Sequence, residues 1–341
     1  MYHDESARGS ARTAARGLRR TRSAFGVSAL LATALALSAC GSTGGDGVAQ
    51  PGELTTVKVG AMPIIDVAPL YLGIEKGFFE EVGLKIEVEI VQSGAASAAA
   101  VVSGGQQFGF AAPTPLIRGG LEGLPVRVIA NAASAALNDN ANAVVVTSDS
   151  AITTAAGLNG KTIGVNALGA ADELYIRAHI DKAGGDSKSM QFVAVPFPNM
   201  VSSLKSGSIA AAGLGQPFLS ASADDVRTLL PDPQREVIGQ DSSLSVWFTS
   251  EDFILKNSDK VSAFIEAIKR SNTYAEEHPD EVIEIIGTFT DLTPEDIANA
   301  QFPRFLPNLH KATFERTVDL MIEYGFINKR PDLASLLAEL K

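Results

Sequence analysis

Short β-rich runs alternate with helical stretches from residue 57 onward, and this alternation most constrains the fold of the chain. The pattern is typical of α/β proteins with a largely parallel sheet. Helices are expected to start near Asp66, which is a plausible cap, at Ser93, and at Pro113, where proline suits the first turn. The first set of strands is expected over residues 57–62, 86–91, 108–111, 126–130 and 143–147.

The strand–helix pattern then restarts. A second set of strands is expected over residues 161–165, 192–195 and 209–213, with helices over 169–183 and 199–206. A strand at 245–249 follows, and the tail is helical over 259–277, 280–288, 294–300, 311–324 and 331–340. Two βα sets followed by a helical tail predict two lobes joined by two crossing strands, near 143–147 and 239–245. We assign residues 54–145 plus 245–341 to lobe 1 and 146–244 to lobe 2.

The N-terminal segment differs from the rest of the chain. Residues 1–39 carry six arginines against Asp4 and Glu5, and residues 23–39 are uncharged and rich in Ala and Leu. The run ends in Leu-Ser-Ala before Cys40, which resembles a bacterial lipoprotein signal. We expect residues 1–39 to be removed, Cys40 to be lipidated, and residues 40–53 to form a flexible tether. A short membrane anchor with an incidental cysteine is the alternative.

Charge and cysteine content exclude several classes of protein. The net charge of −11 argues against nucleic acid as a partner. A single cysteine excludes an internal disulfide and any multi-cysteine metal site, and we expect no metal and no cofactor. Residues 160–162, Gly-Lys-Thr, match the end of a phosphate-binding loop, but Ala155 stands where that motif needs its first glycine.

Two motifs carry a family resemblance. Residues 75–85, EKGFFEEVGLK, resemble a signature of the solute-binding proteins of ABC importers. Residues 157–165, GLNGKTIGV, and the small-residue helix after Gln92-Ser93-Gly94 match the same family. The branch concerned takes up alkanesulfonates, nitrate or taurine, and pyrimidine precursors of thiamine. The resemblance covers nearly all of residues 55–290. Gly77, Phe78 and Phe79 are expected to end a helix and build the core rather than to contact ligand.

The resemblance implies a two-lobed periplasmic-binding-protein fold of type II that closes on its ligand by a hinge motion. It implies an exported, lipid-anchored binding protein on the outer face of the membrane or in the periplasm. Its partners would be a small molecule and the permease and ATPase of an ABC importer. We expect a monomer without catalytic residues.

Family position also indicates which loops would contact the ligand. Helix-start amides can hold an anionic or polar head group, and neighbouring hydroxyl, amide and aromatic side chains can add to this. The candidates from lobe 1 are Ile65, Asp66, Gln92, Ser93, Gly94, Pro113 and Thr114. The candidates from the rest of the chain are Asn166, Leu168, Gly169, Phe197, Asn199, Gln216 and Trp247. Gln216 stands where family members often place an acidic residue.

Several of these residues have a purely structural alternative. Ser93, Thr114 and Asn199 would serve equally well as helix caps. Trp247 lies just past the second crossing and packs either in the cleft or in the core. Arg304 either reaches the cleft or stays on the surface as a solvated cation.

No lysine or arginine occupies the candidate loops. We therefore expect a singly charged sulfonate or carboxylate, or a neutral pyrimidine-type heterocycle, with an apolar portion against Ile64, Ile65, Leu168 and Phe197. A binding protein that feeds a membrane receptor is the first alternative. A pyrimidine-synthesis type of enzyme on the same fold is the second, but the histidines fall away from these loops.

Overall fold

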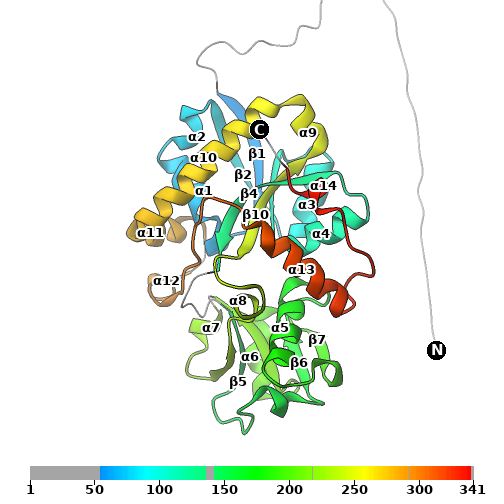
Figure 1. Cartoon of the computed structure of the whole chain (residues 1–341). Helices are drawn as coiled ribbons and strands as arrows, with labels where there is room; N and C mark the ends of the chain where they lie inside the picture. The colour runs from blue at the N-terminus through cyan, green and yellow to red at the C-terminus, as the bar shows by residue number, and fades with distance from the viewer. Residues whose placement is uncertain (1–53, 136–141, 217, 291, 339–341) are drawn as a thin grey trace, which may run out of the picture. The chain divides into compact units, whose positions relative to one another are not determined.

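The fold is known from a computed structural model, which describes residues 54–135, 142–216, 218–290 and 292–338 (Figure 1). The expected signal segment, the tether and Cys40 lie outside the described residues. The described residues all belong to one compact unit of the chain. Among them, no helix is both long enough and apolar enough to cross a membrane.

The first sheet, sheet A, has the strand order β2-β1-β3-β10-β4 among the described residues. Strands β1, β2 and β3 run parallel, and β10 lies antiparallel between β3 and β4. The sheet is therefore mixed, because β10 returns from the second half of the chain. Its strands are β1 (Thr55–Ala61), β2 (Leu84–Ile90), β3 (Phe108–Ala111), β4 (Val126–Ser134) and β10 (Ser243–Ser250).

The second sheet, sheet B, repeats this arrangement with the order β7-β6-β8-β5-β9 among the described residues. Strand β5 lies antiparallel between β8 and β9. Its strands are β5 (Asn142–Thr147), β6 (Thr162–Val165), β7 (Gln191–Ala194), β8 (Ala211–Gly215) and β9 (Val226–Pro231). We refer to each sheet with the helices packed on it as a lobe, the first lobe holding sheet A and the second holding sheet B.

The position of the first crossing differs from the sequence expectation. All of β5 pairs within sheet B, so residues 142–145, which the sequence analysis assigned to lobe 1, lie in the second lobe. The apolar run 143–146 is fully buried between β8 and β9, which fixes it in sheet B. Strand β9 and the short helices beside it were not predicted, because the segment 218–238 shows neither strong alternation nor helical spacing.

The helices mostly follow the sequence prediction. Those before sheet B are η1 (Ile65–Val67), α1 (Ala68–Glu75), α2 (Phe78–Glu81), α3 (Gly94–Val102) and α4 (Pro113–Leu121). Those around sheet B are η2 (Ala155–Leu158), α5 (Ala171–Lys182), η3 (Ser187–Ser189), α6 (Phe197–Lys205), α7 (Phe218–Ala221) and α8 (Pro233–Ile238). The tail holds α9 (Glu251–Lys256), α10 (Ser258–Glu277), α11 (Pro279–Phe289), α12 (Pro294–Asn299), α13 (Lys311–Glu323) and α14 (Leu333–Leu336).

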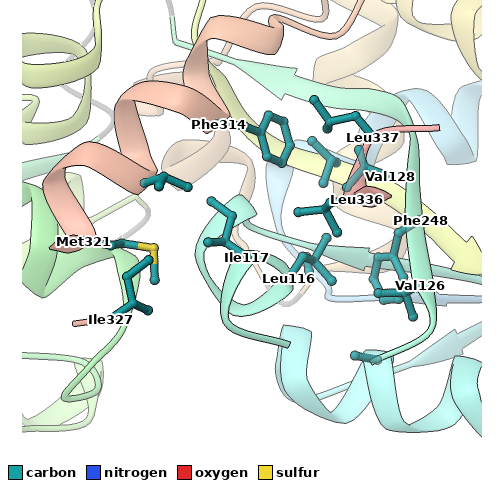
Figure 2. Packing of buried hydrophobic residues seen from close by; sticks show 14 of the residues in the cluster. Leu116, Ile117, Val126, Val128, Phe248, Phe314, Met321, Ile327, Leu336 and Leu337 are labelled. Carbon is teal, nitrogen blue, oxygen red and sulfur yellow. The ribbon is translucent and has the colours of Figure 1, made fainter. Parts of the chain in front are cut away.

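Helices cover both faces of sheet A. Successive side chains of β10 point to opposite faces and pack against different helices. Trp247 packs in one cluster with residues of α1, α2 and α10, whereas Val246 and Phe248 pack in another with residues of α3, α4 and α13. Figure 2 shows this second cluster, in which Leu116 and Ile117 of α4 face Phe314 and Met321 of α13. Of the tail helices, α10 and α13 therefore pack on opposite faces of sheet A.

The family motif around Gly77 builds the first lobe as expected. Gly77 adopts φ 74°, a left-handed conformation that glycine accepts without strain, and so separates α1 from α2. Phe79 is fully buried and its ring contacts Phe264 of α10. The motif is thus a core element.

Helix α13 also contacts the second lobe. Tyr175 of α5 lies 3.1 Å from the Thr317 hydroxyl, and Tyr324, which follows α13, donates to Asp181 at 2.9 Å. Leu174 and Ala178 of α5 join the same hydrophobic cluster as Phe314. Helix α13 therefore packs against both lobes (Figure 1).

Candidate functional site

A cavity of about 100 Å³ lies at the carboxyl end of β8 in the second lobe. The first turns of α5 and α6, the start of β5 and the start of α8 close around it. Ligands of open α/β sheets bind at this kind of edge. The lining residues are Asn142, Ala143, Ala171, Asp172, Tyr175, Ile176, Phe197, Gly213, Leu214, Gly215, Pro233 and Gln234.

Asp172 is the charged residue of this lining. It stands at the second position of α5, and burial raises the pKa of its carboxyl, an effect that its own backbone N–H offsets in part. No other described residue gives this carboxylate an ion pair or a side-chain hydrogen bond. The cavity therefore presents a half-buried, unpaired carboxylate.

Tyr175 stands one turn further along α5 and is nearly fully buried. Burial raises the pKa of its phenol to about 12, so the hydroxyl is neutral at physiological pH. Its hydroxyl lies 3.1 Å from that of Thr317 in α13. The buried Thr114 hydroxyl of α4 also lies near it but reaches no partner at hydrogen-bond geometry. The predicted residue Thr114 therefore lies near Tyr175 but does not line the cavity.

The predicted loop at residues 166–170 lies between β6 and α5 of the second lobe and contacts the first lobe. Asn166 and Leu168 are exposed, and Gly169 has φ 72°. The Gly169 carbonyl accepts a hydrogen bond from Arg118 Nη2 of α4 at 2.9 Å. The Gly169 amide donates to Glu173 at 2.7 Å, so the loop amide predicted to hold an anion already has a partner within α5.

The predicted loop before α6 contributes an aromatic wall. Phe197 lines the cavity and stacks on Phe218 of α7, with ring centroids 5.3 Å apart. Asn199 is exposed, and it caps no helix, because α6 begins two residues earlier at Phe197, where proline at the next position favours a first turn. Gln216 does not line this cavity; its side chain accepts from the Ser220 amide and faces a second hollow beside Asn299.

The predicted residues before α3 and α4 form helix starts in the first lobe. Ser93 caps α3 by accepting from the Ala96 amide, and Gln92 beside it is exposed. A side chain at Gly94 would collide with Ala111, so this glycine allows α3 to approach β3. Pro113 is the first residue of α4 and is buried.

The remaining predicted residues pack inside the first lobe. Ile65 is buried in a cluster with α11 and α12. Trp247 is 1% exposed and contacts the rings of Phe110 and Phe264, so it packs in the core and not in the cleft. Arg304 pairs with Glu276 at 2.8 Å and lines none of the cavities described for the structure.

Asp66 caps no helix, contrary to expectation. Residues Ile65–Val67 form a 3₁₀ turn and α1 begins only at Ala68, so the carboxylate is free to accept from Ser245 Oγ of β10 at 2.8 Å. Burial raises the pKa of Asp66, and this hydrogen bond offsets the effect in part. This hydrogen bond ties η1 to the start of β10 within the first lobe.

Of the predicted residues, Phe197 is the one that lines the cavity. Sequence reasoning missed Asp172, Tyr175, Asn142 and Gln234. The available signal was the helix start after Gly169, whose first turn holds an acid at position 172. Asn142 and Gln234 carry no motif; strand pairing and the α8 turn alone bring them to this edge.

A comparison with protein families matches residues 64–282 to the family described as NMT1/THI5 like. The chain belongs to the NMT1/THI5-like family. One relative is a putative aliphatic sulfonates-binding protein of Bacillus subtilis, 24% identical over 281 residues, or 80% of this chain and 81% of that protein.

Solved structures with a similar fold agree with this family. The periplasmic aliphatic sulphonate binding protein SsuA from Escherichia coli gives a TM-score of 0.69 at 17% identity, covering 83% of this chain and 92% of that one. The periplasmic nitrate-binding protein NrtA from Synechocystis gives 0.64 at 19% identity, covering 81% and 83%. These similarities confirm the two-lobed type II periplasmic-binding-protein fold of this NMT1/THI5-like chain.

Proposed function

We propose that the protein is the solute-binding component of an ABC importer, which captures a small organic molecule and delivers it to a permease driven by an ATPase. The cavity at the carboxyl end of β8 carries this proposal, since it combines a few polar groups with apolar walls. Membership of a family whose named relatives are binding proteins supports it.

Capture requires movement of the two lobes. A ligand that touches both lobes shifts the population toward the closed form by its higher affinity for that form. The Arg118–Gly169 and Tyr175–Thr317 contacts join the lobes beside the cavity in the described state. Both contacts support a closed form in which ligand is shielded from solvent.

The protein acts outside the cytoplasm in this proposal. Export through the segment 1–39 and lipidation of Cys40 would tether it as a monomer to the outer face of the membrane. Replacing Cys40→Ser should move the protein from the detergent phase to the aqueous phase in a detergent partition. Persistence of the variant in the detergent phase would contradict lipid anchoring.

An enzymatic role has less support. Among the described residues that line the cavity, none is a histidine, lysine or cysteine. The Asp172 and Tyr175 side chains could donate or accept hydrogen bonds, but no nucleophile faces them. A protein that binds and releases its ligand unchanged fits this lining better.

A thermal-shift screen tests the proposal. Residues 41–341 without the lipid would be mixed with sulfonates, nitrate, carboxylates, amines and aminopyrimidines. A ligand that binds only the folded protein at a hundredfold excess over Kd stabilises it by about 2.7 kcal/mol. We expect one class of compound to raise Tm, and Phe197→Ala to reduce that shift.

Two further variants test the sequence-predicted loops. Gln92→Ala and Asn199→Ala should weaken ligand binding while leaving Tm without ligand unchanged, because both side chains are exposed. Unchanged affinity in both would remove these loops from the site. Conversion of the bound compound into a product would contradict the proposed function itself.

A further inference from the structure

The first turn of α5 holds two adjacent acids in opposite situations. Glu173 accepts from Arg177 Nε at 2.8 Å and from the Gly169 amide at 2.7 Å, so its charge is fully compensated. Asp172 lines the cavity, and no cation among the described residues pairs with it. Arg177 stands at i+4 from Glu173 and so pairs with it, whereas the structure leaves the Asp172 carboxylate open to a partner from outside the chain.

An unpaired carboxylate in a poorly solvated site is unfavourable unless a partner reaches it. Burial raises the pKa of Asp172, which is the sign of this penalty. The amino end of α5 offsets only part of the penalty, since the helix dipole acts weakly on a single charge. A positively charged, hydrogen-bond-donating group in the cavity would supply the missing partner.

Among the described residues, the lining offers no positive charge to an anion. Asp172 is the lining's only charge among the described residues, and no Lys, Arg or His balances it. The Gly169 amide, which the sequence analysis offered to an anion, already donates to Glu173. A sulfonate or nitrate in this cavity would therefore lie against a like charge.

The apolar residues of the lining indicate what the uncharged part of the ligand would contact. Phe197, held in place by its stack on Phe218, and Ile176 give the cavity an apolar side, and the Tyr175 hydroxyl adds a neutral polar group. The cavity volume of about 100 Å³ is smaller than the roughly 150 Å³ of a cavity that holds benzene. A compact polar head thus fits inside, with a flat body extending along Phe197.

We propose that Asp172 determines the specificity of this cavity, by binding ligands that carry a cationic, hydrogen-bond-donating nitrogen and by rejecting anions. The inference rests on the proposed binding function and narrows its ligand class. It departs from the sequence expectation of a sulfonate or carboxylate, because the acid that discriminates lies on α5, two residues after the predicted loop.

Benzamidinium and benzoate form a matched pair for the test, since they share a ring and differ in the charge of the head group. Calorimetry on residues 41–341 should show binding of benzamidinium and weaker or no binding of benzoate, nitrate and ethanesulfonate. Asp172→Asn should lower the affinity for benzamidinium at least tenfold. Asp259→Asn is the control, since Asp259 also occupies the second position of a helix but is exposed on α10.

A second variant keeps the test valid if Asp172→Asn is poorly folded. Asp172→Glu retains the charge and should retain the preference for benzamidinium over benzoate. Equal benzamidinium affinity in the wild type and Asp172→Asn would overturn the inference, as would stronger binding of an anion to the wild type. Stable binding of an anion would leave the binding function standing, whereas conversion of any bound probe would contradict that function as well.

Discussion

Arg118 of the first lobe donates a hydrogen bond from Nη2 to the Gly169 carbonyl of the second lobe at 2.9 Å. Gly169 reaches this position through a φ of 72°, which exposes its carbonyl just before α5 begins. The contact therefore joins α4 to the loop that leads directly into the cavity wall. We interpret it as a latch that favours the closed arrangement of the lobes.

Replacing Arg118→Ala should weaken ligand binding about threefold to tenfold, because a net hydrogen bond contributes about 0.5–1.5 kcal/mol. The free energy of unfolding should change little, since Arg118 is not part of the hydrophobic core. Calorimetric titration with the ligand found in the thermal-shift screen measures the effect. Arg270→Ala, which removes an ion pair with Glu81 inside the first lobe, is the control. Equal losses in the two variants would contradict the latch.

Trp247 should contribute strongly to stability and not to binding, because its side chain is 1% exposed among aromatic rings. Replacing Trp247→Ala should reduce the free energy of unfolding by about 3–5 kcal/mol. Urea unfolding followed by circular dichroism measures this loss. Trp247→Phe should cost less, since it keeps a ring in the core. A loss below about 1 kcal/mol in the alanine variant would place the residue outside the core.

The half-buried Asp66 carboxyl should make stability depend on pH. Its pKa in the folded protein is raised by burial, so the folded state keeps a proton that the unfolded chain has already released. Stability from this group therefore falls as the pH rises from about 4 through the folded pKa. Asp66→Asn still accepts a hydrogen bond from Ser245 and should be more stable than the wild type at pH 7. A variant less stable at pH 7 and equal at pH 4 would contradict this.

His179 should make the protein less stable as the pH decreases, which is opposite to the effect of Asp66. Burial lowers the pKa of its imidazole, and its buried Nδ1 has no partner among the described residues. Below about pH 6.5 the unfolded chain takes up a proton that the folded state resists, so stability falls as the pH decreases. His179→Gln should lose less stability than the wild type between pH 7.5 and 5.5 in urea titrations. Identical losses would show that another group carries this dependence.

Much of the fold could be predicted from local patterns. The helix starts at Ser93 and Pro113 and the strand Phe108–Ala111 follow from capping, proline geometry and apolar runs, which depend on neighbouring residues alone. The restart of the pattern and the family motif around Gly77 indicated two lobes. The strand β9 escaped because its sequence, VRTLLP, takes its conformation from pairing with β5.

The candidate site was less predictable, because it depends on which side chains lack partners. The i+4 spacing of Glu173 and Arg177 indicates which acid is paired, but no local pattern shows that the neighbouring Asp172 lines a cavity. Trp247 could not be placed, since alternation along β10 assigns a face but not which helices cover it. Asp66 was expected to cap a helix because no local signal reveals Ser245, which is 179 residues away in the sequence.

Measuring the stoichiometry and chemical fate of a bound compound shows whether the protein binds its ligand and releases it unchanged. Residues 41–341 would be titrated calorimetrically with the compound that raises Tm. The compound would then be recovered from the denatured protein, and its mass and amount would be measured by mass spectrometry. We predict one bound molecule per chain, with its mass and amount unchanged after prolonged incubation. Loss of the compound with the appearance of a product, or absence of saturable binding by every compound in the screen, would contradict it.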